Sequence, residues 1–233
     1  MSNTVFDVLR KVTTATITTM LLKKGIRRCW MNGPKPLVAG GDRVIGPAFT
    51  LRFVPVREDV ATPESWAHPV STRAAIEEMP EGAVAVADAM GVAGAGIFGD
   101  ILCARMKKRN VAALVTDGVL RDRAGVLMSA LPVWCSGVAA PASVNGLTFV
   151  GWQQPIGCGG CAIFPGDIIV ADDDGAVVIP QNLLEFVAHE GAEHELYESW
   201  VFSEVENGVK LPGLYPPNDD AKARYAAWRK SKA

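Results

Sequence analysis

The spacing of apolar residues predicts helices at the two ends of the chain and strands between them. In residues 4–28 apolar side chains recur at helical spacing, which predicts one helix that ends at Gly25 or soon after, at Gly33-Pro34. The β-branched run TTATITT in its middle is a weak helix former, so tertiary contacts must hold this segment. Residues 44–56 alternate between apolar and polar positions and predict a strand that is broken at Pro47.

The most regular pattern belongs to a strand–helix–strand unit in the middle of the chain. A short helix at residues 71–79, with Ser71 as its N-cap, comes before it. Within the unit we predict a buried strand, a glycine-rich loop, a helix and a second buried strand, at residues 83–87, 88–98, 100–109 and 111–116. A unit of this length makes its two strands parallel, with a right-handed crossover.

Beyond Asp117-Gly118 the predicted elements are shorter and are joined by turns. We predict a short helix at residues 121–128, strands at 147–152, 168–171 and 176–179, and a long acidic helix at 181–206. The Asp-Gly step at the end of residues 172–175 favours a hairpin between the last two strands. Residues 212–218 (PGLYPPN) fit neither helix nor strand and should pack on a neighbouring surface. The sequence contains no repeat, so the simplest fold class is one mixed α/β domain over residues 1–233.

Composition does not change the predicted fold, but it excludes several classes of protein. The 233 residues suffice for a sizeable core, and a net charge of −2 gives no basic face for nucleic acid. No apolar run reaches the ~18 residues of a membrane helix, and the charged N-terminus lacks the apolar core of a signal peptide. Five cysteines, an odd number, are typical of a reduced protein. We therefore expect a cytoplasmic protein with no membrane and no nucleic-acid partner.

The loop before the central helix, GAGIFG at residues 94–99, matches the glycine pattern of dinucleotide-binding folds. Two details argue against a nicotinamide or flavin site. The first glycine follows the strand only after about six residues, where the fingerprint needs a tight turn. In addition, Asp100 puts a carboxylate at the helix N-terminus, where a pyrophosphate would lie. The glycines suit a smaller anion bound by backbone N–H groups, with a metal ion between that anion and Asp100.

Four aspartates and an arginine follow the two parallel strands. Loops after adjacent parallel strands emerge at one edge of the sheet, so we expect one crevice to hold Asp88, Asp100, Asp117, Asp122 and Arg121. Clustered aspartates favour Mg²⁺ or Mn²⁺ over zinc. The simpler interpretations are that Asp100 is a first-turn acid favoured by the helix dipole and that Arg121 and Asp122 form an ion pair that caps a short helix.

Other motifs do not support a site. Cys158-Gly-Gly-Cys161 lacks the second ligand pair of a structural zinc site and is predicted to be a turn with two buried thiols. His189 and His194 lie on different faces of a helix and are predicted to be exposed. No GxSxG motif accompanies His68, and the lysines lie in polar or terminal stretches, so any aldol chemistry must use a metal ion.

The spacing Asp100…Arg121-Asp122 resembles that of the family which joins the regulator of ribonuclease activity A to 4-hydroxy-4-methyl-2-oxoglutarate aldolase. GPAFT at residues 46–50 and PGDIIVADDDGAVVIP at residues 165–180 match as well, so the resemblance covers nearly the whole chain. It implies a swivelling β/β/α sandwich with a C-terminal helix. It also implies a homotrimer, or a dimer of trimers, with sites between subunits.

The resemblance implies a carbon–carbon lyase that releases pyruvate from a small 4-hydroxy-2-oxo acid and decarboxylates oxaloacetate as a side activity. Asp122 would hold a divalent metal ion, Mg²⁺ or Mn²⁺, and Asp100 would orient the waters around that ion. Arg121 would contact the keto or enolate oxygen of the substrate. Backbone amides of the segment that begins the central helix would bind the substrate carboxylate, at Gly99, Ile101 and Leu102.

The resemblance leaves three points open. A glutamate from the last helix of a neighbouring subunit would complete the metal shell, and the choices are Glu190, Glu193 and Glu195. Family aldolases often carry an acid three residues after the Arg-Asp aspartate, where this chain has Gly125. The regulator branch, which inhibits ribonuclease E, lacks the first aspartate. Asp100 therefore favours the enzyme, and a non-catalytic regulator is the alternative.

Overall fold

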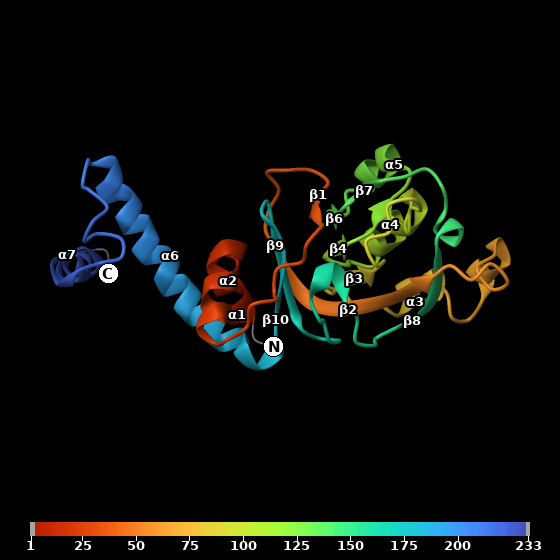
Figure 1. Cartoon of the computed structure of the whole chain (residues 1–233), viewed down its shortest axis with the longest axis horizontal. Coiled ribbons are helices and arrows are strands. Elements are labelled where there is room, and N and C mark those ends of the chain that lie inside the picture. The colour runs from red at the N-terminus through yellow and green to blue at the C-terminus, as the bar shows by residue number, and fades with distance from the viewer. Residues whose placement is uncertain (1–2, 232–233) are drawn as a thin grey trace.

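A computed structural model describes residues 3–231 and has a mixed sheet at its centre (Figure 1). Residues 1–2 and 232–233, the ends of the predicted domain, lie outside the described residues. The strand order is β1-β6-β4-β3-β2-β9-β10, and β8 also pairs with β2. The strands of this sheet are β1 (Lys35–Pro36), β2 (Val44–Pro55), β3 (Val84–Asp88), β4 (Ala113–Thr116), β6 (Val133–Cys135), β8 (Leu147–Trp152), β9 (Ile168–Asp172) and β10 (Gly175–Ile179).

The predicted strand–helix–strand unit is confirmed as β3, α4 (Asp100–Lys108) and β4, with β3 and β4 parallel. Alternate residues of β3 enter two different apolar clusters, Val84 and Val86 one and Ala85 and Ala87 the other, so the sheet is buried on both faces. The second cluster packs under α3 (Thr72–Glu78), α4 and α5 (Arg123–Met128). The β9–β10 hairpin lies in the first cluster with α2 (Thr14–Lys23) and α6 (Leu184–Glu206). This layering is the β/β/α sandwich that the resemblance implied.

The predicted break of β2 at Pro47 is wrong, because β2 is continuous. Its first part, from Val44 to Pro47, pairs with β9, and the part from Ala48 onward pairs with β3. Pro47 is the last residue of β2 that pairs with β9, and pairing with β3 begins one residue later. Proline, which has no N–H, is tolerated there because the side of the strand toward β3 is not yet hydrogen-bonded. The strand thus connects the two halves of the sandwich.

The single helix predicted at residues 4–28 is also wrong. The segment forms α1 (Asn3–Leu9) and α2, which begins after Thr13 and ends just before Gly25 in the left-handed conformation (φ +82°). The Thr13 hydroxyl accepts a hydrogen bond from the N–H of Thr16, and both its N–H and its hydroxyl donate to Glu195 of α6, each at 2.7 Å. This contact between residues far apart in the chain holds Thr13, the N-cap of α2, against α6, and no local pattern reveals it.

We expect Glu195→Ala to lower the free energy of unfolding by about 1–3 kcal/mol, because two donors of Thr13 lose their partner. Burial opposes ionisation of Glu195, but the hydrogen bonds from Thr13 prevail and lower the pKa of this carboxyl. A lowered pKa gives stability that is complete above the unfolded-state value of about 4.3 and is lost as the pH falls through the folded-state value.

Thermal melts of wild type and Glu195→Ala at several pH values measure this effect, with Glu206→Ala, an exposed site on the same helix, as control. The difference in melting temperature should be full near neutral pH and should shrink below about pH 4. Equal melting temperatures at neutral pH would contradict the role of Glu195.

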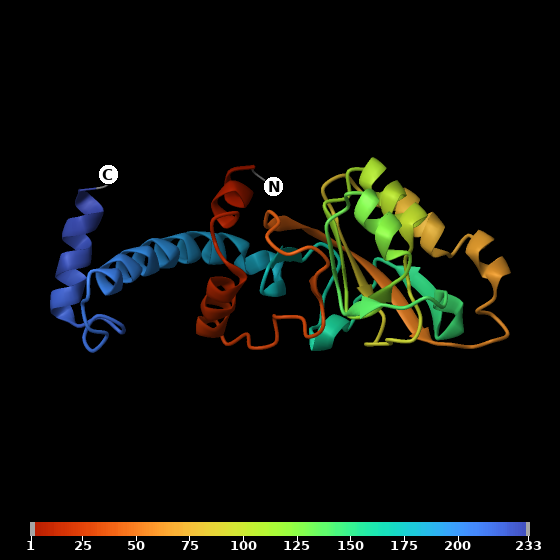
Figure 2. The same cartoon turned by 90° about the horizontal axis from the view of Figure 1, so that it is seen from above.

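The last helices form an arm that extends away from the sheet (Figures 1 and 2). A short turn at Gln181–Leu183 leads into α6, and α7 (Asp219–Lys230), which we did not predict, lies against the far end of α6. We define the distal arm as residues 197–231. It has its own apolar cluster around Trp200 and Leu214, joined by Tyr225 and Trp228 of α7. The prediction that residues 212–218 form neither helix nor strand is confirmed, and this segment packs on α6 through Leu214. Among the described helices, none is long and apolar enough to span a bilayer.

Candidate active site

All six predicted site residues line one pocket of about 230 Å³: Gly99, Asp100, Ile101, Leu102, Arg121 and Asp122. The start of α4 supplies the first four, and the connection from β5 (Val119–Leu120) to α5 supplies the other two. The same wall includes residues that the sequence did not indicate, namely Trp66, Thr72 and Arg73 from the segment around α3, and Ala142 and Ser143.

Hydrogen bonds between the glycine loop and β5 bring these residues together. The N–H of Ile97 donates to Val119 O at 2.9 Å, and the N–H of Arg121 donates to Phe98 O at 3.0 Å. A Cβ on Gly96 would lie 2.8 Å from the backbone nitrogen of Arg121, so the close approach requires glycine there. Gly96 of the glycine pattern therefore serves the packing of two backbone segments.

Asp122 adopts a left-handed backbone conformation (φ 54°, ψ 42°) at the N-cap of α5. This conformation costs an L residue on the order of 1 kcal/mol, although aspartate tolerates it better than most. Its Oδ2 accepts from Arg121 Nε at 3.0 Å, and its side chain caps no helix N–H. The simpler interpretation of Arg121 and Asp122 was an ion pair that caps a short helix. The ion pair is confirmed, and the cap is wrong. Asp122 instead lines the pocket.

The two aspartates lie where α4 meets α5, each against a glycine near the other. A Cβ on Gly99 would lie 2.5 Å from Asp122 Oδ2, and a Cβ on Gly125 would lie 2.6 Å from Asp100 Cβ and Oδ2. Glycine at 125, the departure from the family pattern, thus makes room for Asp100 in its present position. An acidic side chain at 125 requires Asp100 to move.

The N–H of Ile101 is already occupied in this structure, since it donates to Asp100 Oδ1 at 2.7 Å. A substrate carboxylate could bind this amide, as the resemblance implies, only in place of the Asp100 carboxylate.

The predicted convergence of four aspartates is wrong, because Asp88 and Asp117 line a different hollow. Asp117 accepts from the N–H groups of Ala89 and Gly159, and Asp88 accepts from that of Gly157. Burial raises the pKa of Asp117, and the hydrogen bonds from Gly159 and Ala89 oppose this rise. These two aspartates hold the Cys158–Gly160 turn against the sheet. The β5 segment carries Arg121 and Asp122 away from them, and β5 forms a separate two-stranded sheet with β7 (Gly137–Val138).

The pocket supplies two carboxylates for a metal ion, and within residues 3–231 no three histidine, cysteine or acidic side chains gather as a complete ligand set. Mg²⁺ fits such a site, since it commonly binds through one or two carboxylates and keeps several waters. Asp100 and Asp122 are therefore chemically suited to hold a hydrated divalent ion.

The resemblance implied that Glu190, Glu193 or Glu195 completes a metal shell in a neighbouring subunit. Two of these three glutamates have hydrogen-bond partners within their own chain. Glu195 binds Thr13, and Glu193 accepts from Arg229 of α7 at 2.6 Å. Glu190 is exposed and contacts only the neighbouring His189 ring among its recorded partners in the described chain. Glu190 is thus the one of these three glutamates without a hydrogen bond to a distant segment in the described chain.

The remaining sequence motifs are structural. Cys158 and Cys161 form the predicted buried turn, and their thiols donate in different directions, to Ala87 O and to Trp30 O. Burial raises the pKa of Cys161 to about 11, so the thiol is protonated near neutral pH. The prediction of exposure is confirmed for His189 and wrong for His194, which is half-buried beside Glu198.

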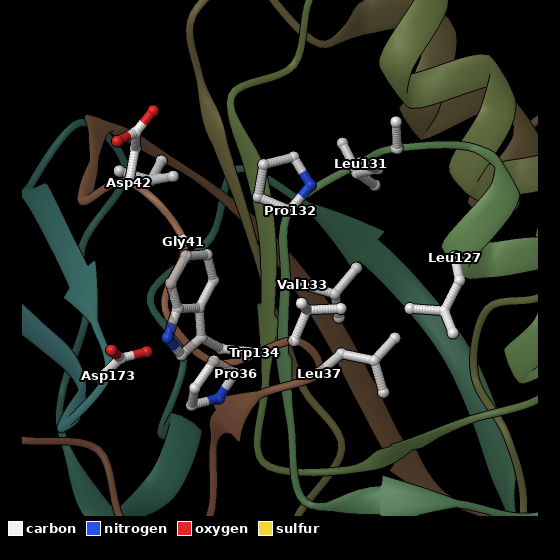
Figure 3. A pocket seen from close by; sticks show the side chains of 13 residues that line it. Pro36, Leu37, Gly41, Asp42, Leu127, Leu131, Pro132, Val133, Trp134 and Asp173 are labelled. Carbon is white, nitrogen blue, oxygen red and sulfur yellow. The ribbon is translucent and has the colours of Figure 1, made fainter.

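Another hollow, of about 320 Å³, lies beside β1 and β6 (Figure 3). Its wall is mostly apolar, with Leu127 and Leu131 on one side and Asp42 and Asp173 on the other. It lacks a basic side chain, so it offers no group to bind a 2-oxo acid.

The chain belongs to the RraA-like family, because the family model described as Aldolase/RraA matches residues 11–178. Its structure is similar to that of RraAS2 from Streptomyces coelicolor, described as an unusual member of the RNase ES inhibitor RraA protein family. That similarity has a TM-score of 0.77 at 36% identity, over 86% of this chain and 96% of the other. The family match ends before α6, so the arm lies beyond it.

Two curated relatives match most of this chain. DlpA from Legionella pneumophila is 31% identical over 177 residues, which are 76% of this chain and 28% of DlpA. The chain thus spans little more than a quarter of that relative. A protein of Halalkalibacterium halodurans, provisionally named as a 4-hydroxy-4-methyl-2-oxoglutarate aldolase, is 34% identical over 169 residues. These are 70% of this chain and 74% of that protein.

Proposed function

We propose that the protein is a divalent-metal-dependent lyase that cleaves a 4-hydroxy-2-oxo acid to pyruvate and a second carbonyl compound. The observation that carries this proposal is one pocket lined by Arg121, by two carboxylates, Asp100 and Asp122, and by the residues that begin α4. The aldolase name of the H. halodurans relative supports the same class.

Each residue of the pocket has its own role toward the substrate. The amides at Ile101 and Leu102 bind the C1 carboxylate, and Arg121 donates to the C2 keto oxygen. A Mg²⁺ or Mn²⁺ ion held by Asp122 and Asp100 would supply a Lewis acid for the 2-oxo acid group. Asp100, released from the Ile101 amide, orients the water that removes the C4 hydroxyl proton.

Loss of that proton breaks the C3–C4 bond. Its electron pair moves toward C2 and leaves pyruvate enolate, whose oxygen charge Arg121 stabilises, and C4 leaves as a carbonyl. Protonation at C3 completes pyruvate. Oxaloacetate gives the same enolate when its C3–C4 bond breaks and C4 leaves as carbon dioxide. Decarboxylation of oxaloacetate is therefore the expected side activity of this site.

We further propose that the active form is a homotrimer or a dimer of trimers in the cytoplasm. Glu190 of a neighbouring subunit then reaches the metal shell, since Glu193 and Glu195 have partners in their own chain. The five cysteines are free thiols, which suits a reducing compartment.

Pyruvate release from oxaloacetate by the purified protein tests the proposal. We expect release with Mg²⁺ or Mn²⁺, its loss with EDTA and its recovery when excess metal is added back. The spontaneous metal-catalysed reaction, measured without protein, is subtracted. Absence of release with either metal would contradict the lyase assignment.

The second candidate is a non-catalytic regulator of ribonuclease activity, favoured by the similarity to RraAS2. Such a protein would bind a ribonuclease equally well with or without EDTA and would tolerate loss of Asp122. A pull-down of ribonuclease under both conditions separates the two candidates.

A further inference from the structure

The hollow beside β1 and β6 takes no part in the proposed lyase chemistry, yet it has the form of a ligand site (Figure 3). The edge strand β1 is two residues long, and the chain leaves the sheet over residues 37–43 before β2 begins. The hollow of about 320 Å³ lies between this segment and the end of α5. Small-molecule sites are usually concave and mostly apolar, with a few placed polar groups, and this volume suffices for a small ligand.

One side of the hollow is apolar and has no side-chain donor to spare. Leu127 of α5 and Leu131, which follows α5, lie on this side (Figure 3). Trp134 carries the one side-chain donor among the described residues that line the hollow, and its Nε1 donates to Asp172 O at 2.7 Å. An anionic group would therefore lose its hydration here and gain no partner from a side chain. A hydrocarbon group gains free energy because it leaves water.

The other side of the hollow carries two carboxylates, Asp42 and Asp173 (Figure 3). The N–H of Gly40 donates to Asp173 Oδ1 at 2.9 Å, and this bond ties the segment that carries Asp42 to the turn between β9 and β10. Neither carboxylate takes part in an ion pair recorded within residues 3–231, whereas the neighbouring Asp172 is paired with Arg43. The hollow thus joins an apolar side to a side of negative charge.

We propose that this hollow is a second binding site and that its ligand is a small organic ammonium ion with a hydrocarbon body. The cation lies toward Asp42 and Asp173, and the hydrocarbon body lies against Leu127, Leu131 and Trp134. Charge complementarity selects the head of the ligand, and burial of apolar surface binds its body. The inference is independent of the proposed lyase function, because the two pockets share no lining residue.

Three compounds with the same six-carbon chain test the chemistry of the ligand: hexylammonium, 1-hexanol and hexanoate. Their dissociation constants for the full chain are measured by ligand-observed NMR titration at low ionic strength. We expect hexylammonium to bind roughly 3- to 10-fold more tightly than 1-hexanol, the effect of two exposed carboxylates on one cation. Hexanoate should bind more weakly than both. Added salt should reduce the preference for hexylammonium and leave the binding of 1-hexanol almost unchanged.

Two variants separate the head of the ligand from its body. The double variant Asp42→Asn/Asp173→Asn should remove the preference for hexylammonium and keep the affinity for 1-hexanol, and both side chains are exposed, so the fold should tolerate it. Leu127→Gln, also at an exposed position, should weaken the binding of both compounds, because it removes part of the apolar side. Asp59→Asn is the matched control, an exposed aspartate that does not line the hollow, and it should bind all three compounds as wild type does.

Three results would overturn the proposal. The first is equal affinity of wild type for hexylammonium and hexanoate, or no binding of hexylammonium. The second is the same preference in wild type and in the double variant, which would place the cation elsewhere. The third is a second copy of the chain in the hollow. In that case hexylammonium would bind more weakly as the protein concentration rises, and Leu127→Gln would lower the mass measured by sedimentation.

Discussion

Asp122→Asn is expected to lower metal-dependent pyruvate release by roughly 10³-fold or more, because it removes the charge that would hold the divalent ion in the proposed mechanism. Asparagine has nearly the size of aspartate and tolerates the left-handed conformation of residue 122. The variant should therefore fold normally, whereas alanine there would add backbone strain to the loss of charge.

The measurement is the rate of oxaloacetate decarboxylation over a range of Mg²⁺ concentrations. Asp59→Asn, an exposed aspartate outside this pocket, is the control and should retain wild-type rates. Excess metal that restores full activity to Asp122→Asn would show weakened affinity alone. Wild-type activity at low metal would refute the assignment of Asp122.

Arg121→Ala is expected to reduce kcat by roughly 10²- to 10³-fold, the usual effect of removing a preorganised donor to a developing oxyanion. The same change frees Asp122 from its 3.0 Å ion pair, so metal affinity has to be measured in parallel. Steady-state kinetics at saturating metal then report on the oxyanion alone.

Arg123→Ala is the matched control, two residues further on and outside the pocket lining. It should change kcat little. Arg121→Lys should recover part of kcat, because an ammonium group supplies charge without the planar fork of donors. A rise in KM with unchanged kcat in Arg121→Ala would mean that Arg121 binds substrate and transition state equally.

Elements whose signals are local could be predicted from the sequence. The buried alternation of β3 and β4, the Asp-Gly hairpin between β9 and β10 and the Ser71 cap all depend on neighbouring residues. The helix α7 also had such a signal, since Ala221, Tyr225 and Trp228 recur at helical spacing after the Asn218 cap.

The errors concern contacts between distant segments. At the start of α2, Thr13 is held by Glu195, which is 182 residues away in the chain. The separation of Asp88 and Asp117 from Asp100 and Asp122 depends on the pairing of the glycine loop with β5, which no periodicity indicates. The grouping of Gly99 to Leu102 with Arg121 and Asp122 was predictable because parallel strands end at a common edge. Arg73 and Trp66 were not, since they come from a different part of the chain.

The distal arm divides the molecule into parts that need not unfold together. Its aromatic cluster is built within residues 197–231 and shares no buried residue with the two clusters on the faces of the sheet. Local opening can therefore separate α7 from α6 while β3 and β4 keep all their hydrogen bonds. Backbone amides of the arm then exchange with solvent through this local opening, and those of the central sheet exchange only when the whole protein unfolds.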